Sequence, residues 1–223
     1  MATVLITGAN RGIGLALAQQ FAARGDRVIA ACRHASAALA QTGAQVEAGV
    51  DVTNGAAVDA LARRLRDARI DTLVLNAGIL EKESLGTIDA AGFDGIRRQF
   101  EVNALGPLRV AQALRDRVVD GGRIGIITSR MGSMADNQSG GYYGYRASKA
   151  AVNAIGKSLA VDLAPRGIAV VLLHPGYVAT DMVGGHGDVS PADAARQLIA
   201  RLDALSPAAS GTFQHANGAV LPW

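Results

Sequence analysis

The stretch TVLITGANRGIGLALAQQF, residues 3–21, decides the fold of this chain. It begins with a short apolar, β-branched run, continues through a turn that holds Gly8, Gly12 and Gly14, and ends in a helical pattern. Gly8 permits a sharp turn, Gly12 lets the backbone approach a pyrophosphate, and Gly14 allows close packing of the helix. Free N–H groups and the dipole at the helix N-terminus favour an anion there. The stretch therefore predicts a strand, a nucleotide-binding turn and a helix.

The rest of the chain repeats this alternation of apolar runs and helical patterns. Further strands are predicted at 27–31, 71–76, 123–128 and 168–174, with a weaker one at 45–50 and an edge strand within 211–223. Helices are predicted at 13–24, 56–69, 93–119, 145–164 and 191–205. Such alternation implies right-handed crossovers and a doubly wound parallel sheet of about seven strands, with helices on both faces. No linker or repeat interrupts the pattern, so we expect one domain over residues 1–223.

Composition argues against several classes of function. Apolar residues make up 49% of the 223 residues and charged residues 18%, as in a globular protein. The single cysteine, Cys32, forms no internal disulfide framework and offers no cysteine-based metal site. The net charge of +3 comes from scattered arginines without a basic stripe, which argues against nucleic-acid binding. Because we find neither a signal-like start nor a long apolar run, we expect a cytoplasmic protein without a membrane segment.

The glycine spacing is Gly-x3-Gly-x-Gly rather than the Gly-x-Gly-x2-Gly of the general dinucleotide fingerprint. Further motifs follow in the order DV (51–52), NAG (76–78), VNALGP (102–107), a serine at 129, YRASK (145–149) and HPGYVATDM (174–182). With these motifs the chain resembles the short-chain dehydrogenase/reductase family over essentially its whole length. It is most similar to the sniffer/C-factor-like branch of small carbonyl reductases. The resemblance implies a Rossmann fold that binds a nicotinamide cofactor.

The resemblance also implies which residues contact that cofactor. They are Gly8, Asn10, Arg11, Gly12, Ile13, Gly14, Arg33, Asp51, Val52, Asn76, Ala77, Gly78, Tyr145, Lys149, Pro175, Gly176, Val178 and Thr180. Some of them also have a structural explanation. Asp51 and Val52 also suit the start of a helix, and Asn76 also suits a role in stabilising its strand.

Two arginines favour NADP(H) over NAD(H). In this fold an acidic residue after the second strand binds the adenosine ribose, whereas an arginine there accommodates a 2′-phosphate. The corresponding position is Cys32, followed by Arg33, and Arg11 lies within the glycine turn. A guanidinium binds phosphate through a planar, charge-assisted contact. Each arginine alone is equally well explained as a solvated loop charge, so the preference depends on the pair.

Lys149 selects one tyrosine from GGYYGYRASKA, residues 140–150. Residues four apart share a helix face, so Tyr145 lies one turn before Lys149, whereas Tyr143 points elsewhere. Tyr142 is two turns away, about 10 Å along the axis. A phenol has a pKa of about 10, and a nearby ammonium is expected to lower it by about 1–3 pH units. We predict that Tyr145 donates a proton to a carbonyl oxygen as hydride arrives. The family resemblance adds that Lys149 holds the nicotinamide ribose.

Two further polar residues complete the predicted catalytic group. Ser129 follows a strand at the carboxyl end of the sheet, where its hydroxyl can polarise a substrate carbonyl. Ser133 is the rival, and the gap from Ser129 to Tyr145 is longer than is usual in the family. The resemblance gives Asn103 a water that links Lys149 to solvent; the alternative for Asn103 is a polar residue that kinks its helix.

Together these residues predict an NADPH-dependent enzyme that reversibly reduces an aldehyde or ketone to an alcohol. The alternative is an NADP(H)-binding regulatory or signalling protein with little turnover. The helices predicted at 93–119 and 145–164 pack between subunits in many members of the family, so we expect a homodimer or homotetramer.

Overall fold

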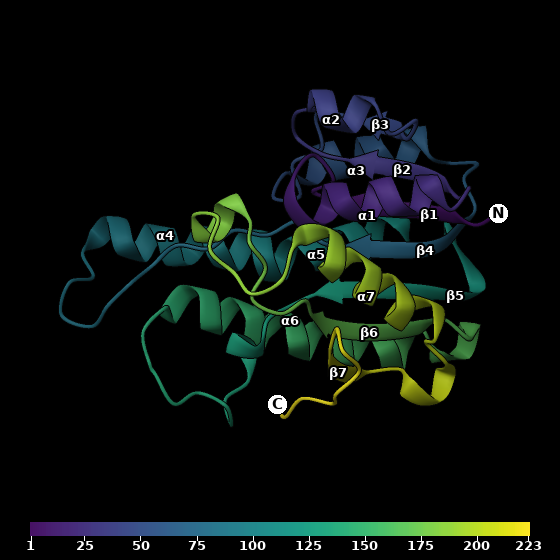
Figure 1. The fold of residues 1–223 in the computed structure, drawn as a ribbon. Coiled ribbons are helices and arrows are strands. Elements are labelled where there is room, and N and C mark those ends of the chain that lie inside the picture. The colour runs from purple at the N-terminus through teal and green to yellow at the C-terminus, as the bar shows by residue number, and fades with distance from the viewer.

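The computed structural model describes residues 1–223, whose strands form one sheet covered by helices on both faces (Figure 1). The strands are β1 (Thr3–Thr7), β2 (Arg27–Ala31), β3 (Gln45–Glu47), β4 (Ile70–Leu75), β5 (Val118–Ile127), β6 (Ala169–His174) and β7 (Thr212–His215). Every neighbouring pair is parallel, in the order β3-β2-β1-β4-β5-β6-β7. The chain moves outward from β1 to β3, returns to β4 beside β1, and then moves outward to β7. This topology confirms the predicted doubly wound fold.

Two apolar layers hold the helices to the sheet. The helices are α1 (Gly12–Ala23), α2 (Ala37–Ala40), α3 (Gly55–Arg64), α4 (Ala90–Phe100), α5 (Gly106–Leu114), α6 (Tyr143–Asp162) and α7 (Pro191–Asp203). Alternate residues of β1 face opposite layers, as the pleat requires: Leu5 packs with α3, α5 and α6, whereas Val4 and Ile6 pack with α1 and α7. The strands therefore read as continuous apolar runs because both faces are covered.

The helix predicted at 93–119 is wrong in its extent. It divides into α4, a π-helical turn at Glu101–Leu105 and α5, and it ends at Leu114. Strand β5 begins at Val118 and passes through the DGG sequence that resembles a turn, with a shift in its register against β4. A bulge of this kind keeps a strand paired across residues that would otherwise end it. Helix α2 was not predicted, because four residues are too few to show a helical period.

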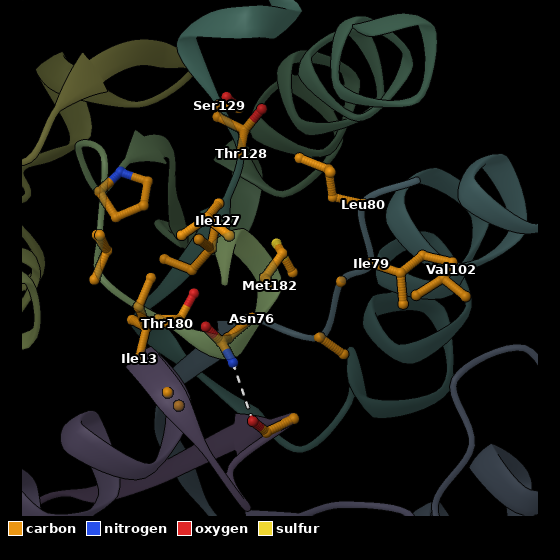
Figure 2. Close-up of a pocket in the computed structure, with 18 of the residues that line it drawn as sticks. Ile13, Asn76, Ile79, Leu80, Val102, Ile127, Thr128, Ser129, Thr180 and Met182 are labelled. Atoms are coloured by element: carbon orange, nitrogen blue, oxygen red, sulfur yellow. Dashed lines mark hydrogen bonds between the residues drawn. The ribbon is translucent and has the colours of Figure 1, made fainter. Parts of the chain in front are cut away.

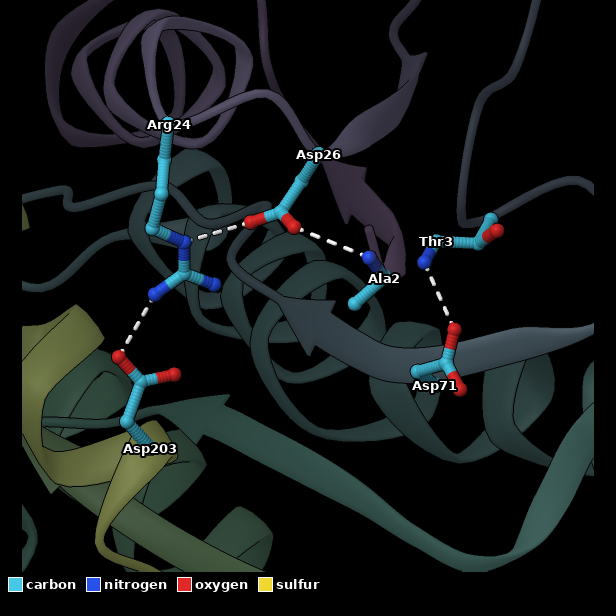
Figure 3. A network of polar contacts seen from close by, with 6 residues as sticks. All are labelled: Ala2, Thr3, Arg24, Asp26, Asp71 and Asp203. Carbon is cyan, nitrogen blue, oxygen red and sulfur yellow. Dashed lines mark hydrogen bonds and ion pairs between the residues drawn. The ribbon is translucent and has the colours of Figure 1, made fainter.

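A polar network closes the edge of the sheet where the parallel strands begin (Figure 3). Arg24, after α1, pairs with Asp26 and with Asp203 at the end of α7, each at 2.6 Å. The Asp26 carboxylate also accepts from the backbone N–H of Ala2 at 3.0 Å, and Asp71 accepts from that of Thr3 at 2.7 Å. These contacts fix α1 and α7 to the start of β1, which leaves the opposite edge free for a site.

The packing of α1 predicts a large loss of stability on truncation of Phe21. This side chain is 1% exposed between α1 and the sheet. We expect Phe21→Ala to lower the free energy of unfolding by about 3–5 kcal/mol, because it removes buried surface and leaves a cavity. Val161→Ala, at a residue that is 63% exposed on α6, is the control and should change it by less than about 0.5 kcal/mol. Urea denaturation measures both, and equal losses would contradict the packing described.

Candidate active site

A cavity of about 810 Å³ lies along the carboxyl ends of the strands, where open α/β sheets bind ligands. Its walls come from the β1–α1 turn, the ends of β2, β4 and β5, the start of α6 and the segment after β6. Figure 2 shows part of it, with Ile13 beside the first turn and Ser129 at the opposite end. Every residue predicted for the site lines this cavity except Asn103.

The β1–α1 turn is built from glycines that no other residue could replace without strain. Gly8 and Gly12 have φ of +67° and +54°, a region that side chains rarely adopt. A side chain at Gly14 would overlap the carbonyl oxygen of Gly8 and the side-chain amide of Asn76. Gly14 thus packs against the turn itself and the end of β4.

The first turn of α1 offers its N–H groups to the cavity. Arg11 precedes the helix and makes no side-chain cap, and no acidic residue lies in the first turn. By contrast, Ser36, Asn54, Asp89 and Ser190 cap the starts of α2, α3, α4 and α7 with their side chains. Uncapped N–H groups at a helix start suit an anion. The turn therefore fits the pyrophosphate of a dinucleotide.

Asn76 joins the two halves of the sheet next to this turn. Its Nδ2 donates to the carbonyl oxygens of Thr7 at 3.0 Å and Gly8 at 3.2 Å, and the Thr7 hydroxyl accepts from the backbone N–H of Asn76 at 3.0 Å (Figure 2). The amide is thus committed to the end of β1. These contacts support the role of Asn76 in stabilising its strand, which was the alternative to direct cofactor contact. Ala77 and Gly78, the next two residues, line the cavity.

The predicted adenosine end lies after β2 and β3. Arg33 is exposed at the cavity rim beyond buried Cys32, and no hydrogen bond or ion pair holds its guanidinium. Asp51 accepts from the backbone N–H and the hydroxyl of Thr53, at 2.9 and 2.8 Å. These bonds, with help from Arg33, lower the pKa of Asp51. The carboxylate stays ionised while Arg33 remains available to a ligand.

The segment after β6 closes the other side of the cavity. Arg11 of the glycine turn pairs with Asp181 of this segment at 3.4 Å, with both side chains exposed. Gly176 has φ of +93°, and Val178 is buried and bridges to Val189. Pro175 and Thr180 also line the cavity. The two ends of the predicted cofactor site are therefore bridged by a solvent-accessible ion pair.

Tyr145, Lys149 and Ser129 meet at the far end of the cavity. Tyr145 and Lys149 lie one turn apart on α6 and are 8% and 4% exposed. The Lys149 Nζ lies 5.7 Å from the centre of the Tyr145 ring and donates to the carbonyl oxygen of Ile127, at the end of β5, at 3.0 Å. Ser129 follows that strand, and its side chain lies close enough to the Tyr145 hydroxyl to lower the pKa of the phenol. Tyr145, which its spacing from Lys149 singled out, is therefore the tyrosine whose side chain lies beside Ser129.

Burial moves the pKa values of these two groups in opposite directions. It raises the pKa of Tyr145 to about 12, against a smaller lowering by the hydrogen bond with Ser129. It lowers the pKa of Lys149 to about 8. The prediction that Lys149 lowers the phenol's pKa is therefore wrong in direction, because removal from water disfavours the phenolate more than the neighbours favour it. The phenol is held protonated at neutral pH.

Ser133 is engaged elsewhere. Its hydroxyl donates to the carbonyl oxygen of Trp223 at 3.0 Å and accepts from the backbone N–H of Asp136 at 3.1 Å. It does not line the cavity, whereas Ser129 does. The same Trp223 oxygen accepts from the N–H groups of Met134 and Ala135 at 3.0 and 3.1 Å. Ser133 thus anchors the loop after β5 to the last residue of the chain.

Asn103 lies in the π-helical turn, behind the cavity wall. Its side chain accepts from the N–H of Ile79 at 2.8 Å and donates to the Ile79 carbonyl oxygen at 2.9 Å and to Ser148 at 3.0 Å. A methyl group placed on Gly78 would lie 3.2 Å from Asn103 Oδ1 and 3.7 Å from Lys149 Nζ. Asn103 therefore holds the segment after β4 against α6, close to Lys149.

The approach to α6 contains an unusual turn. Gly140, Gly141 and Tyr142 all have positive φ, of 64°, 63° and 52°, and Tyr142 is the only non-glycine residue with positive φ. Arg146 gathers this turn: its Nε donates to the Gly140 and Gly141 carbonyl oxygens at 3.3 and 3.2 Å, and its Nη2 donates to Ser139 at 2.8 Å. The two glycines before the tyrosines thus serve a turn that places Tyr142 and Arg146 in the cavity wall.

Glu83 holds the same turn through its side chain and its backbone. The sequence did not predict this role. The buried Glu83 carboxylate accepts from Gln99 Nε2 at 2.5 Å and from the backbone N–H of Gly144 at 3.2 Å, and the Glu83 carbonyl oxygen accepts from the Tyr142 N–H at 3.0 Å. A carboxylate at the start of a helix satisfies free N–H groups and complements the dipole. A lone glutamate in a loop gives no such signal in the sequence.

The sequence of this chain is similar to those of known enzymes. Residues 2–189 match the model of the short chain dehydrogenase family. The chain belongs to the short-chain dehydrogenase/reductase family. This membership confirms the resemblance drawn from the motifs, and the family is one of oxidoreductases. None of the helices combines the length and hydropathy that a membrane-spanning helix needs.

Two curated members of the family are notably similar. The chain is 46% identical over 229 residues to 1-hydroxy-2-glutathionyl-2-methyl-3-butene dehydrogenase of Rhodococcus sp. (strain AD45), with 100% of both chains covered. It is 43% identical over 157 residues to the C-signal of Myxococcus xanthus, covering 69% of this chain and 93% of that protein. The second relative supports the predicted branch.

Solved structures agree with the fold. A short-chain dehydrogenase/reductase of Burkholderia multivorans with bound NADP has a TM-score of 0.91 and 32% identity, covering 100% of this chain and 99% of that one. The carbonyl reductase Sniffer of D. melanogaster has a TM-score of 0.89 and 28% identity, covering 100% of both. These neighbours support NADP binding and the sniffer-like branch.

The lowered pKa of Lys149 predicts a pH-dependent contribution to stability. Between about pH 8 and the ordinary value of 10.5, the folded protein has released this proton while the unfolded chain retains it, so stability rises with pH. The difference in unfolding free energy between wild type and Lys149→Met should therefore rise between about pH 7.5 and 9.5, on the order of 1–2 kcal/mol. Urea denaturation across this range measures it. Lys157→Met, at an exposed residue, should follow the wild-type pH dependence, and a flat difference for Lys149→Met would contradict the assignment.

Proposed function

We propose that the protein catalyses the NADPH-dependent reduction of an aldehyde or ketone to an alcohol, and the reverse oxidation. The observation that carries the proposal is the meeting of the Tyr145 and Ser129 hydroxyls beside buried Lys149, at one end of a cavity whose other end fits a dinucleotide. The names of the relatives support the same chemistry. One is a dehydrogenase of a hydroxy compound and another is a carbonyl reductase.

The cavity residues would hold the cofactor along its length. The β1–α1 turn and the free N–H groups of α1 would take the pyrophosphate, and Arg33 with Arg11 would take the 2′-phosphate of NADPH. Asp51 and Val52 would lie at the adenine, Lys149 at the nicotinamide ribose, and Val178 with Thr180 at the nicotinamide end. When bound, NADPH supplies a hydride to the carbonyl carbon of the substrate.

Ser129 and Tyr145 would act on the substrate's carbonyl oxygen. As hydride adds to the carbon, the C=O electron pair moves to oxygen, where the Ser129 hydroxyl donates a hydrogen bond to the developing charge. Tyr145 then gives its proton to that oxygen, which yields the alcohol. A phenol whose pKa is about 12 is fully protonated at neutral pH and can act as this acid without prior uptake of a proton. In the reverse direction the Tyr145 phenolate, once its proton has been released, would take the proton from the alcohol while Ser129 holds the same oxygen by a hydrogen bond.

Lys149 and Asn103 would restore the proton on Tyr145. The pKa of Lys149, near 8, allows its ammonium to release a proton at modest cost near neutral pH. Asn103 fixes the Ile79 backbone beside Gly78 and Lys149, at the end of the cavity wall. We propose that the route from Lys149 to solvent passes here through water. Asn103 thus acts through the position of its neighbours rather than on the substrate.

Removal of the phenolic hydroxyl tests the catalytic proposal. We expect Tyr145→Phe to lower kcat for NADPH-dependent carbonyl reduction by about 10²–10⁴-fold, because general-acid catalysis is lost. Ser129→Ala should lower kcat by a comparable factor, because it loses the donor to the oxyanion. Absorbance of NADPH with a panel of aldehydes and ketones measures turnover, and fluorescence titration checks that NADPH still binds.

Ser133→Ala is the matched control, since Ser133 bonds Trp223 instead of facing the cavity. It should retain a kcat much closer to wild type than Ser129→Ala does. Turnover that survives Tyr145→Phe unchanged would overturn the proposed mechanism.

The choice of cofactor is tested at Arg33. Loss of a hydrogen bond to a charged group costs about 1.5–3 kcal/mol, which corresponds to about 10–100-fold in affinity. We expect Arg33→Ala to raise KM for NADPH by about this factor and to leave KM for NADH nearly unchanged. Arg27→Ala, at the opposite end of β2, is the control. Equal effects on both cofactors would contradict the assignment of the 2′-phosphate.

A regulatory role is the second candidate, and similarity to the protein named C-signal favours it. It would use the same cofactor site to report NADPH rather than to turn over substrate. The aldehyde and ketone assay separates the two: tight NADPH binding without turnover of any carbonyl in the panel would favour regulation. We place catalysis first because Tyr145, Lys149 and Ser129 are all present and line the same end of the cavity.

A further inference from the structure

Three cationic side chains line one wall of the cavity at its substrate end. They are Lys82, Arg130 and Arg146. The Tyr142 N–H donates to the Glu83 carbonyl oxygen at 3.0 Å, which places the segment of Lys82 against the turn before α6. Arg146 bonds the other side of that turn and reaches toward the Met131 carbonyl oxygen at 3.5 Å, next to Arg130. Side chains from three distant segments thus converge on one wall, which we call the cationic wall.

Acidic residues offset only part of this charge. Asp136 pairs with Arg130 at 2.7 Å. Arg146 bonds only neutral oxygens, and Lys82 makes no hydrogen bond or ion pair. The carboxylates on either side of Lys82 in the sequence are engaged elsewhere: Glu81 is paired with Arg98, and buried Glu83 is bonded to Gln99 and Gly144. Neither of these two lines the cavity.

His174, which also lines the cavity, lies within reach of one of these charges. Burial, together with the smaller effects of the charges of His215, Arg130 and Lys149, lowers the pKa of His174 to about 4. A positive field in a cavity with low-dielectric walls attracts anions. Arg130 of the cationic wall is thus close enough to His174 to disfavour a second positive charge there.

The cofactor's phosphates would not use this charge. They are proposed to lie at the β1–α1 turn and Arg33, after β2, whereas Arg130 follows β5. Strands β1 and β4 separate β2 from β5 in the sheet, so these ends are about 14 Å apart at the usual strand spacing. The apolar side chains of Leu80 and Met182 also line the cavity (Figure 2).

We propose that the preferred substrate is a carbonyl compound, or the corresponding alcohol, with an apolar body and a carboxylate. The carboxylate binds the cationic wall while the carbonyl faces Ser129 and Tyr145. Lys82 is the specificity-determining residue, because its ammonium is free whereas Arg146 also holds the turn before α6. This inference rests on the proposed reductase function and names the substrate class of that same site.

A pair of matched aldehydes tests the charge. 4-Carboxybenzaldehyde and 4-formylbenzamide have nearly the same shape, but only the first carries a carboxylate at neutral pH. We expect wild type to show kcat/KM about 10-fold higher for the carboxylate, mainly through a lower KM, and this ratio should shrink with added salt. Lys82→Met should reduce the ratio to about 2–3, and Lys82→Glu should invert it.

Lys157→Met is the matched control, because it removes the same charge from α6 outside the cavity. It should keep the wild-type ratio. A wild-type ratio near one, or equal ratios for Lys82→Met and Lys157→Met, would overturn the inference while leaving the reductase function intact. If wild type reduces neither aldehyde, calorimetry on NADP⁺-loaded protein compares 4-carboxybenzyl alcohol with 4-carbamoylbenzyl alcohol. Preferential binding of the acid that depends on Lys82 would then support the cationic wall, and equal binding would overturn it.

Discussion

The amide of Asn76 is the contact on which the site depends. It bonds two successive carbonyl oxygens at the end of β1 and so holds β4 to β1 at the point where the chain changes its direction across the sheet. A crevice opens at such a point because the helices on either side diverge. Gly14 leaves the room that this amide occupies, so the glycine turn and the end of β4 constrain each other. Because this junction holds β1 and β4 together, the two halves of the cavity that are built on these strands keep a fixed position relative to each other.

Burial then gives the chemistry its direction. The same desolvation that makes Tyr145 a reluctant phenolate makes Lys149 a reluctant ammonium, so the pair keeps one proton on the phenol and releases the other easily. A protonated donor and a nearby group that titrates near neutral pH suit reduction of a carbonyl. An ammonium beside a phenol would by itself lower the phenol's pKa, but here burial outweighs that effect.

Local patterns in the sequence predicted most of the strands and helices, because apolar strand runs, helix stop signals and the glycine turn each depend on only a few consecutive residues. The four-residue spacing from Tyr145 to Lys149 survived for the same reason. What failed depended on distant partners. The early start of β5 needs pairing with β4, and Ser133 is removed from contention by Trp223, 90 positions away. The turn held by Arg146, the support from Glu83 and the direction of the Tyr145 pKa likewise follow from packing that no short stretch encodes.

The contact between Trp223 and the loop after β5 joins two segments that are far apart in the sequence. The Trp223 oxygen accepts from Ser133, Met134 and Ala135, and its ring stacks on Phe213 of β7, with ring centres 5.6 Å apart. The same loop carries Arg130 and Asp136, which line the cavity, whereas Trp223 does not. A substitution at residue 223 would therefore act on the cavity wall near Ser129 at second hand, through the backbone of this loop.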